Sequence, residues 1–412
     1  MRIEDLRKES EGDRSRVCAK IVWEDADRPG RDLFFETTAP FADALTLNPN
    51  AFLLSCILPA MANGEKRIRV DGRLCPELKD NLMVATGWVR HWYGPPRRPI
   101  AIESTRGDDH CRPAMPPRAA SFLSGGIDSL ATLWENRMNF TPDHPRWIKD
   151  CLVLHGFDIG VRENGGKEYP LFDRTVQHLT SVANQAGVAL IPVYTNARFV
   201  DDDRRRFNLE YHGAVLAAAG HAFSRRLTSV AISSSASYEN AHPWGSDPRL
   251  DTHYSSTGLQ VLHTGFQHSR LEKVKIVAQW PAGLANVRVC IRNPVDRVNC
   301  GRCQKCIRTM LELYAIGKLP EAATFPGSDI RVEQVRRLRW GFFRFHTHYL
   351  VELYPYLRKM GRDDLVRMIE KRRRQYTLFY AGAERLGLVE LAKNIDRRYF
   401  NSAITGLLGR LF

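Results

Sequence analysis

The chain has 412 residues, of which 43% are hydrophobic and 26% charged, as is typical of globular proteins with two or three domains. No apolar run reaches the ~18–20 residues of a membrane helix, and the charged start MRIEDLRKESEGDR lacks the apolar core of a secretory signal, so we expect a cytoplasmic protein. The net charge is +14, and residues 330–412 carry 18 Lys and Arg against 8 Asp and Glu. This excess favours anionic partners, although a solvated basic helical face would explain it equally well.

Residues 1–93 mix short β-rich pieces with more helical ones, which predicts a small α+β domain. Residues 94–118, GPPRRPIAIESTRGDDHCRPAMPPR, are rich in proline, arginine and glycine and predict a linker or a strap across the surface.

From residue 119 the pattern alternates between strands and helices. Strands are expected at 119–124, 151–158, 188–196, 227–235 and 287–291, and helices at 127–138, 171–187 and 208–226. Such alternation predicts an α/β fold with a parallel, doubly wound sheet over residues 119–325, which binds ligands beyond the carboxyl ends of its strands. Residues 326–412 are expected to form a basic helical region.

The most informative segment is SFLSGGIDSLATLW, in which a strand, a tight turn and a helix follow one another. Gly125 and Gly126 let backbone N–H groups approach an anion, and the hydroxyls of Ser124 and Ser129 lie at the positive end of the helix. Asp128 is suited to bind Mg²⁺ through oxygen. The spacing fits neither a Walker A loop nor a dinucleotide fingerprint. A glycine-rich turn without a ligand is the alternative.

Nine cysteines are an odd number for a disulfide scaffold, and four of them form the pattern C-x9-C-x2-C-x2-C. Four thiolates at this spacing predict a tetrahedral, structural Zn²⁺ site. An iron–sulfur cluster is the alternative, because thiolates also bind Fe–S clusters. The predicted ligands are Cys290, Cys300, Cys303 and Cys306.

The loop residues match the SGGxDS signature of the PP-loop ATP pyrophosphatases at every fixed position. Together with the cysteine pattern they resemble 7-cyano-7-deazaguanine synthases over about residues 119–315. The resemblance implies a PP-loop/HUP-type sheet and a loop that binds the β- and γ-phosphates of ATP. It also aligns Ser269 and Arg270 with a Thr-Lys pair of that family and Glu272 with its glutamate, and Lys273 is a second candidate for contacting phosphate. The ATP-binding residues it implies are Ser124, Gly125, Gly126, Ile127, Asp128, Ser129, His155 and Asp158, and the catalytic ones are Ser124, Asp128, Ser129, Arg270 and Lys273.

Residues 233–257 start at the expected active edge of the sheet as a long polar loop, and loops of this length are usually functional or mobile. A solvated loop without a specific role is the alternative. The candidate substrate residues are His242, Arg249, Asp251 and His253, with Glu272 from the family box.

These features predict an AMP-forming, ligase-like enzyme that uses ATP, Mg²⁺ and a structural Zn²⁺. A carboxylate or amide oxygen would attack the α-phosphate, pyrophosphate would leave, and a nitrogen nucleophile would displace AMP. The acceptor stays open between a small deazapurine-like molecule, a nucleic acid and a protein, and no membrane is expected as a partner. The alternatives are an enzyme that modifies RNA or protein, by thiolation or deazaguanine attachment, and a subunit that binds partners through the terminal additions in a multi-protein assembly such as a phage-defence system.

Overall fold

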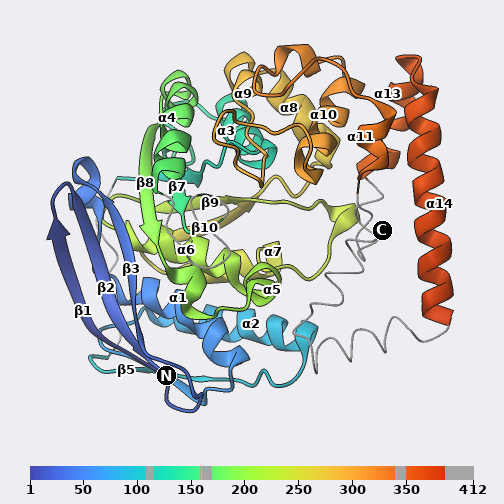
Figure 1. The fold of residues 1–412 in the computed structure, drawn as a ribbon. Coiled ribbons are helices and arrows are strands. Elements are labelled where there is room, and N and C mark those ends of the chain that lie inside the picture. Colours follow the sequence, from blue (N-terminus) through green and yellow to red (C-terminus); the bar gives the residue numbers. More distant parts are fainter. Residues whose placement is uncertain (108–115, 158, 160–168, 339–348, 386–412) are drawn as a thin grey trace. The chain divides into compact units, whose positions relative to one another are not determined.

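A computed structural model describes residues 1–107, 116–157, 159, 169–338 and 349–385 (Figure 1). The chain divides into two compact units. The first unit comprises Met1–Ser237 and Ala241–Gln267, and the second comprises Tyr238–Asn240 and His268–Phe412.

The first unit contains a sheet of ten strands in the order β10-β9-β6-β7-β8-β3-β2-β1-β4-β5. Most of the neighbouring pairs are parallel, and the antiparallel pairs are β1–β2, β2–β3 and β3–β8. The strands are β1 (Arg2–Glu11), β2 (Arg14–Val22), β3 (Arg31–Thr38), β4 (Arg67–Val70), β5 (Ala101–Ser104), β6 (Ala119–Phe122), β7 (Ile148–His155), β8 (Ala189–Thr195), β9 (Ser229–Ser233) and β10 (Gln260–Thr264). The predicted α/β class with a largely parallel sheet is therefore confirmed.

The parallel part of the sheet changes winding direction at β6. From β6 the chain proceeds to β7 and β8 on one side, and then returns to β9 and β10 on the other. In doubly wound sheets ligands bind in the crevice outside the carboxyl ends of the strands at such a switch point. The segment that follows β6 therefore occupies the position where a ligand is expected.

Helices cover both faces of this sheet. In Figure 1, α3 and α4 lie on one face, and α1 and α6 lie on the other. The helix α1 is buried from Asn50 to Ala62, in keeping with its apolar sequence. The helices of this unit are α1 (Pro49–Ala62), α2 (Pro76–Tyr93), α3 (Ile127–Asn139), α4 (Tyr169–Ala186), α5 (Arg204–Arg206), α6 (His212–Ala222) and α7 (Pro248–Asp251), with a π-helical turn at Phe207–Tyr211 and 3-10 turns at Ala39–Ala44, Ala197–Val200 and Thr252–Tyr254.

The second unit is helical in its described part. Its helices are α8 (Arg270–Ala278), α9 (Pro281–Ala285), α10 (Gln304–Ala315), α11 (Val332–Arg336), α13 (Tyr354–Lys359) and α14 (Asp363–Arg385), with 3-10 turns at Tyr238–Asn240 and Leu319–Glu321. Across the described residues of both units, no helix has the length and apolar character needed to cross a membrane.

The N-terminal strands belong to the same sheet as the parallel strands. Strand β3 pairs in antiparallel orientation with β8, so that Phe35 lies opposite Thr195. Side chains reinforce this junction, because Thr37 Oγ1 donates to Pro192 O at 2.7 Å and Thr195 Oγ1 donates to Phe34 O at 2.7 Å. The sheet thus runs across the boundaries predicted at residues 93 and 118, and β5 lies inside the predicted linker.

Two predicted details are wrong: the strand at residues 287–291 and the structureless loop at residues 233–257. Residues 287–291 form no strand, because the N–H groups of Val289 and Cys290 donate to the side chain of Asn299, at 3.0 and 3.2 Å, and not to a neighbouring strand. The edge strand is instead β10, which pairs in parallel with β9. Residues 233–257 also contain regular structure, namely α7 and the 3-10 turns Tyr238–Asn240 and Thr252–Tyr254.

Candidate active site and metal centre

The SGGIDS loop connects β6 to α3 at the switch point of the sheet. Leu123 N still donates to Leu152 O of β7 at 2.9 Å, so the chain leaves the sheet only at Ser124. Gly125 is buried and has φ +77°, a conformation that favours glycine. Gly126 is the N-cap of α3 and provides no capping side chain. The first N–H groups of this helix are therefore not covered by a cap from its own N-terminus.

Two serine hydroxyls hold the shape of the loop. Ser129 Oγ lies 3.3 Å from both the N and the Oγ of Ser124, and donates to Gly126 O at 3.0 Å. Gly126 N in turn donates to Ser124 Oγ at 3.3 Å. Ser129 is buried, Ser124 is exposed and Asp128 is half-buried. The predicted loop residues therefore lie together, with Ser129 supporting the loop and Ser124 at its surface.

His155 ends β7 at the same edge of the sheet. Its side chain is buried among aromatic rings, with centroid distances of 5.3 Å to Phe172 and 5.6 Å to Tyr194. These contacts suit a residue of the core, and its predicted contact with adenosine stays a prediction. Asp158, its predicted companion, lies outside the described residues.

Arg249 is held by its neighbours in the first unit. Its guanidinium makes two hydrogen bonds of 2.8 Å to the carboxylate of Asp247, and it lies 4.6 Å from the ring centroid of Trp92. The carboxylate partner raises the pKa of Arg249. His242 packs against Trp244 at 5.6 Å, and His253 is half-buried. Substrate contacts for these residues stay predictions.

Asp251 belongs to a buried polar cluster. Its side chain is fully buried, and its Oδ2 accepts hydrogen bonds from Ser246 Oγ at 2.6 Å and from His263 Nδ1 at 2.8 Å. His263 lies on β10, and its side chain is 1% exposed. Sequence reasoning missed His263 because β10 was not predicted. The cluster joins the short helix α7 to the edge of the sheet.

We expect Asp251→Asn to lower the free energy of unfolding by about 2–4 kcal/mol, because it removes the charge that faces His263 in a buried site. Chemical denaturation followed by tryptophan fluorescence would measure the change. Asp202→Asn is the matched control, since this carboxylate is 62% exposed and its contacts to Arg31 are 3.3–3.4 Å long. That control should change the stability by less than about 1 kcal/mol. An Asp251→Asn protein of unchanged stability would contradict a structural role.

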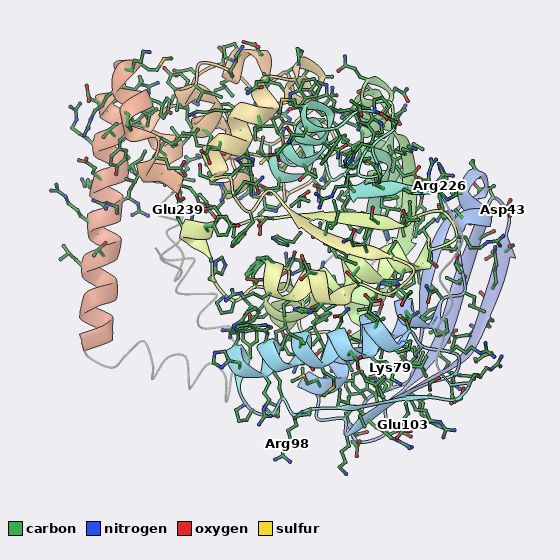
Figure 2. All side chains as sticks on the ribbon, turned by 180° about the vertical axis from the view of Figure 1, so that it is seen from behind. Asp43, Lys79, Arg98, Glu103, Arg226 and Glu239 are labelled. Carbon is green, nitrogen blue, oxygen red and sulfur yellow. The ribbon has the colours of Figure 1, made fainter. Side chains whose placement is uncertain are left out.

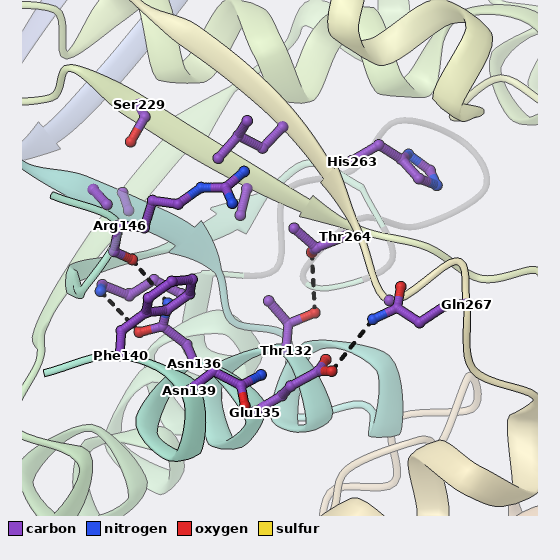
Figure 3. Close-up of a pocket in the computed structure, with 16 residues that line it drawn as sticks. Thr132, Glu135, Asn136, Asn139, Phe140, Arg146, Ser229, His263, Thr264 and Gln267 are labelled. Carbon is purple, nitrogen blue, oxygen red and sulfur yellow. Dashed lines mark hydrogen bonds between the residues drawn. The ribbon is translucent and has the colours of Figure 1, made fainter. Parts of the chain in front are cut away.

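A cavity of about 240 Å³ lies between α3 and the strands β6, β9 and β10 (Figure 3). Small residues such as Ala120 and Ala231 make room for it. At one end Thr132 Oγ1 lies 3.4 Å from Thr264 Oγ1, and Gln267 donates to Glu135 at 3.3 Å. The side chain of His263 points away from Thr132 and Glu135 in this view. The cavity is small for an organic ligand, and it could not be predicted from the sequence because its walls come from separate elements.

The residues aligned with the Thr-Lys pair and the glutamate of the synthase family lie in the second unit, together with Lys273, and make local contacts there. Ser269 and Glu272 form a capping box at the start of α8, in which Ser269 N donates to Glu272 Oε2 at 2.6 Å. Arg270 is buried and donates to Glu312 and to Thr309, each at 3.2 Å. Lys273 is also buried. Contacts of Arg270 and Lys273 with phosphate, and of Glu272 with substrate, stay predictions.

The four predicted cysteines converge in the second unit. The sulfur atoms of Cys290, Cys300, Cys303 and Cys306 all lie within 4.8 Å of one another. Four thiolates at about 2.3 Å from a tetrahedral Zn²⁺ would be about 3.8 Å apart. The Cys300 and Cys306 sulfur atoms are 3.9 Å apart, so the set fits a metal ion closely. The structure supports a four-cysteine metal site.

The backbone around the cysteines is arranged for thiolates. Cys300 Sγ accepts the N–H groups of Arg302 and Cys303 at 3.4 and 3.3 Å. Gly301, between Cys300 and Arg302, has φ +66°, and a Cβ there would lie 2.4 Å from Pro326 Cγ. Hydrogen bonds from Cys290 and Cys306 lower the pKa of Cys303, which favours the charged form that binds metals.

Asn299 fixes the approach to this centre. It is fully buried and accepts the backbone N–H groups of Val289 and Cys290, while its amide donates to Val287 O at 2.7 Å. Such outer contacts hold metal ligands in position.

No protein-family model, curated protein or solved structure matches this chain significantly.

Proposed function

We propose that this chain is a PP-loop enzyme that cleaves ATP between its α- and β-phosphates and transfers AMP to an acceptor. One observation supports the proposal most strongly: the SGGIDS loop lies between a parallel strand and a 13-residue helix at the switch point of the sheet. Backbone N–H groups at such a helix start favour phosphate, and Gly125, at φ +77°, has no Cβ that could block an anion.

The proposed chemistry is mainly positioning and charge stabilisation. An acceptor carboxylate or amide oxygen attacks the α-phosphorus, the bond to the bridging oxygen breaks, and pyrophosphate leaves with its negative charge. The loop N–H groups and the Ser124 hydroxyl would bind the pyrophosphate, and Asp128 would bind Mg²⁺. A nitrogen nucleophile then displaces AMP and loses a proton. Among the possible acceptors, the resemblance to 7-cyano-7-deazaguanine synthases implies the carboxylate of a 7-deazaguanine.

The test is product analysis of the full chain with ATP and Mg²⁺, with 7-deazaguanine carboxylate, tRNA or protein extract as the acceptor. We expect AMP and pyrophosphate in equal amounts, and loss of both in Ser124→Ala and Asp128→Asn. Thr180→Ala is the control, because this exposed hydroxyl donates to Val176 O within its own helix, at 2.9 Å. Formation of ADP and phosphate, or failure to bind ATP, would disprove the proposal.

A further inference from the structure

The excess positive charge of the chain lies in the second unit. This unit has 28 Lys and Arg against 14 Asp and Glu, whereas the first unit has 32 of each. The whole net charge of +14 is therefore concentrated in the part of the chain that also contains the cysteine centre. A net positive charge concentrated on one unit produces a positive electrostatic potential that attracts polyanions.

The second unit also has a groove of about 500 Å³ between α8, the end of α10 and α13. Three lysines line it, of which Lys318 forms an ion pair with Glu321 at 2.6 Å, and none of its described lining residues is acidic. Lys275 Nζ donates to Tyr356 Oη at 2.7 Å, so its charge is fixed beside an aromatic ring. Met360 is 45% exposed and adds an apolar surface. The groove thus combines lysine charges with flat and apolar side chains, in a volume suited to a small organic group. Its lining residues are Lys275, Ala278, Gln279, Ala315, Ile316, Gly317, Lys318, Tyr356, Lys359 and Met360.

The long helix α14 carries further exposed cations. Its first turns are anchored by Leu365, Val366 and Ile369, which are buried. Beyond them, Lys371 and Arg374 are exposed on successive turns. These two side chains therefore present positive charge to solvent.

We propose that the second unit binds single-stranded nucleic acid, with one base in the groove beside Tyr356 and Met360. Lys275 and Lys359 at the groove and the exposed cations of α14 bind the phosphates. An acidic peptide would use the same charges, but the aromatic and apolar surface favours bases, which stack on such side chains irrespective of sequence. A duplex keeps its bases stacked inside and would leave the groove unused. This proposal does not depend on ATP cleavage.

The test is fluorescence anisotropy of a fluorescein-labelled 20-nucleotide RNA with the full chain at 50–200 mM KCl, without ATP. The triple variant Lys359→Gln, Lys371→Gln, Arg374→Gln should weaken binding and reduce the slope of log K against log salt by about 2, since each phosphate contact on a single strand contributes about 0.7. The charge-matched control Lys20→Gln, Arg90→Gln, Arg98→Gln removes exposed cations from the first unit, including Arg98 at the surface in Figure 2. The control should bind like the unchanged chain.

Variants of Tyr356 test the base site itself. Tyr356→Ala should raise the Kd roughly tenfold through loss of stacking, whereas Tyr356→Phe should stay within about threefold. Metal content and circular dichroism of each variant report whether the unit is folded. Equal effects of the two triple variants, equal affinity for a duplex, or tighter binding of a glutamate-rich peptide than of RNA would each overturn the proposal.

Discussion

Gly125→Ala is expected to lower the affinity of the chain for ATP with Mg²⁺ by at least tenfold. Gly125 has φ +77°, and a Cβ in this conformation costs about 1–2 kcal/mol per residue. The backbone would relieve this strain by rotating the peptide groups that flank Gly125, and these groups carry the N–H donors proposed to face the phosphates. Titration calorimetry with ATP or with its non-cleavable α,β-methylene analogue would measure the affinity.

Gly187→Ala is the matched control for this variant. Gly187 follows α4, has φ +64°, and a Cβ there would meet no atom within 4 Å. The Gly187→Ala substitution imposes a similar backbone strain at the amino end of β8, away from the SGGIDS loop. We expect similar losses of stability in the two variants and loss of nucleotide affinity only in Gly125→Ala. Unchanged affinity in both variants would argue against phosphate binding at the loop.

The loop and the cysteine centre could be predicted because their residues lie close together in the chain. Ser124 and Ser129 are five positions apart, and their hydrogen bonds follow from the local strand–turn–helix path. Cys300, Cys303 and Cys306 likewise lie within one segment of seven residues, and their sulfur atoms converge. In both cases the sequence spacing alone restricts the geometry.

The surroundings of these segments depend on contacts that the sequence pattern does not reveal. The pairing of β3 with β8 joins residues about 160 positions apart, such as Phe35 and Thr195, so the N-terminal strands looked like a separate domain. The sequence places Asp251 in a polar loop, whereas in the structure α7 and β10 enclose its side chain together with His263. Residues 287–291 have a strand-like sequence, but Asn299 takes the N–H groups that a neighbouring strand would need.

Cys306→Ser is expected to abolish stoichiometric metal binding and to unfold the second unit. Cys306 is fully buried and lies in the first turn of α10, so its loss removes one of four ligands and the tie between that helix and the Cys290 segment. Structural zinc contributes about 10–16 kcal/mol of apparent binding free energy, more than a domain's usual net stability. Elemental analysis should find one zinc per chain before the substitution, and limited proteolysis should then cut within residues 268–385.

The control for this substitution is Cys56→Ala, which removes a buried thiol from α1 of the first unit. Its metal content should equal that of the unchanged chain, since Cys56 lies outside the cysteine centre.

A milder variant, Gly301→Ala, would press a Cβ to 2.4 Å from Pro326 and should weaken metal affinity about 10–100-fold while all four thiols remain. Gly317→Ala has a similar φ of +71° with no atom within 4 Å and should retain its metal. If Cys306→Ser kept full metal content, the four thiolates could not be the ligand set; a brown protein containing iron would assign the same four thiolates to an iron–sulfur cluster.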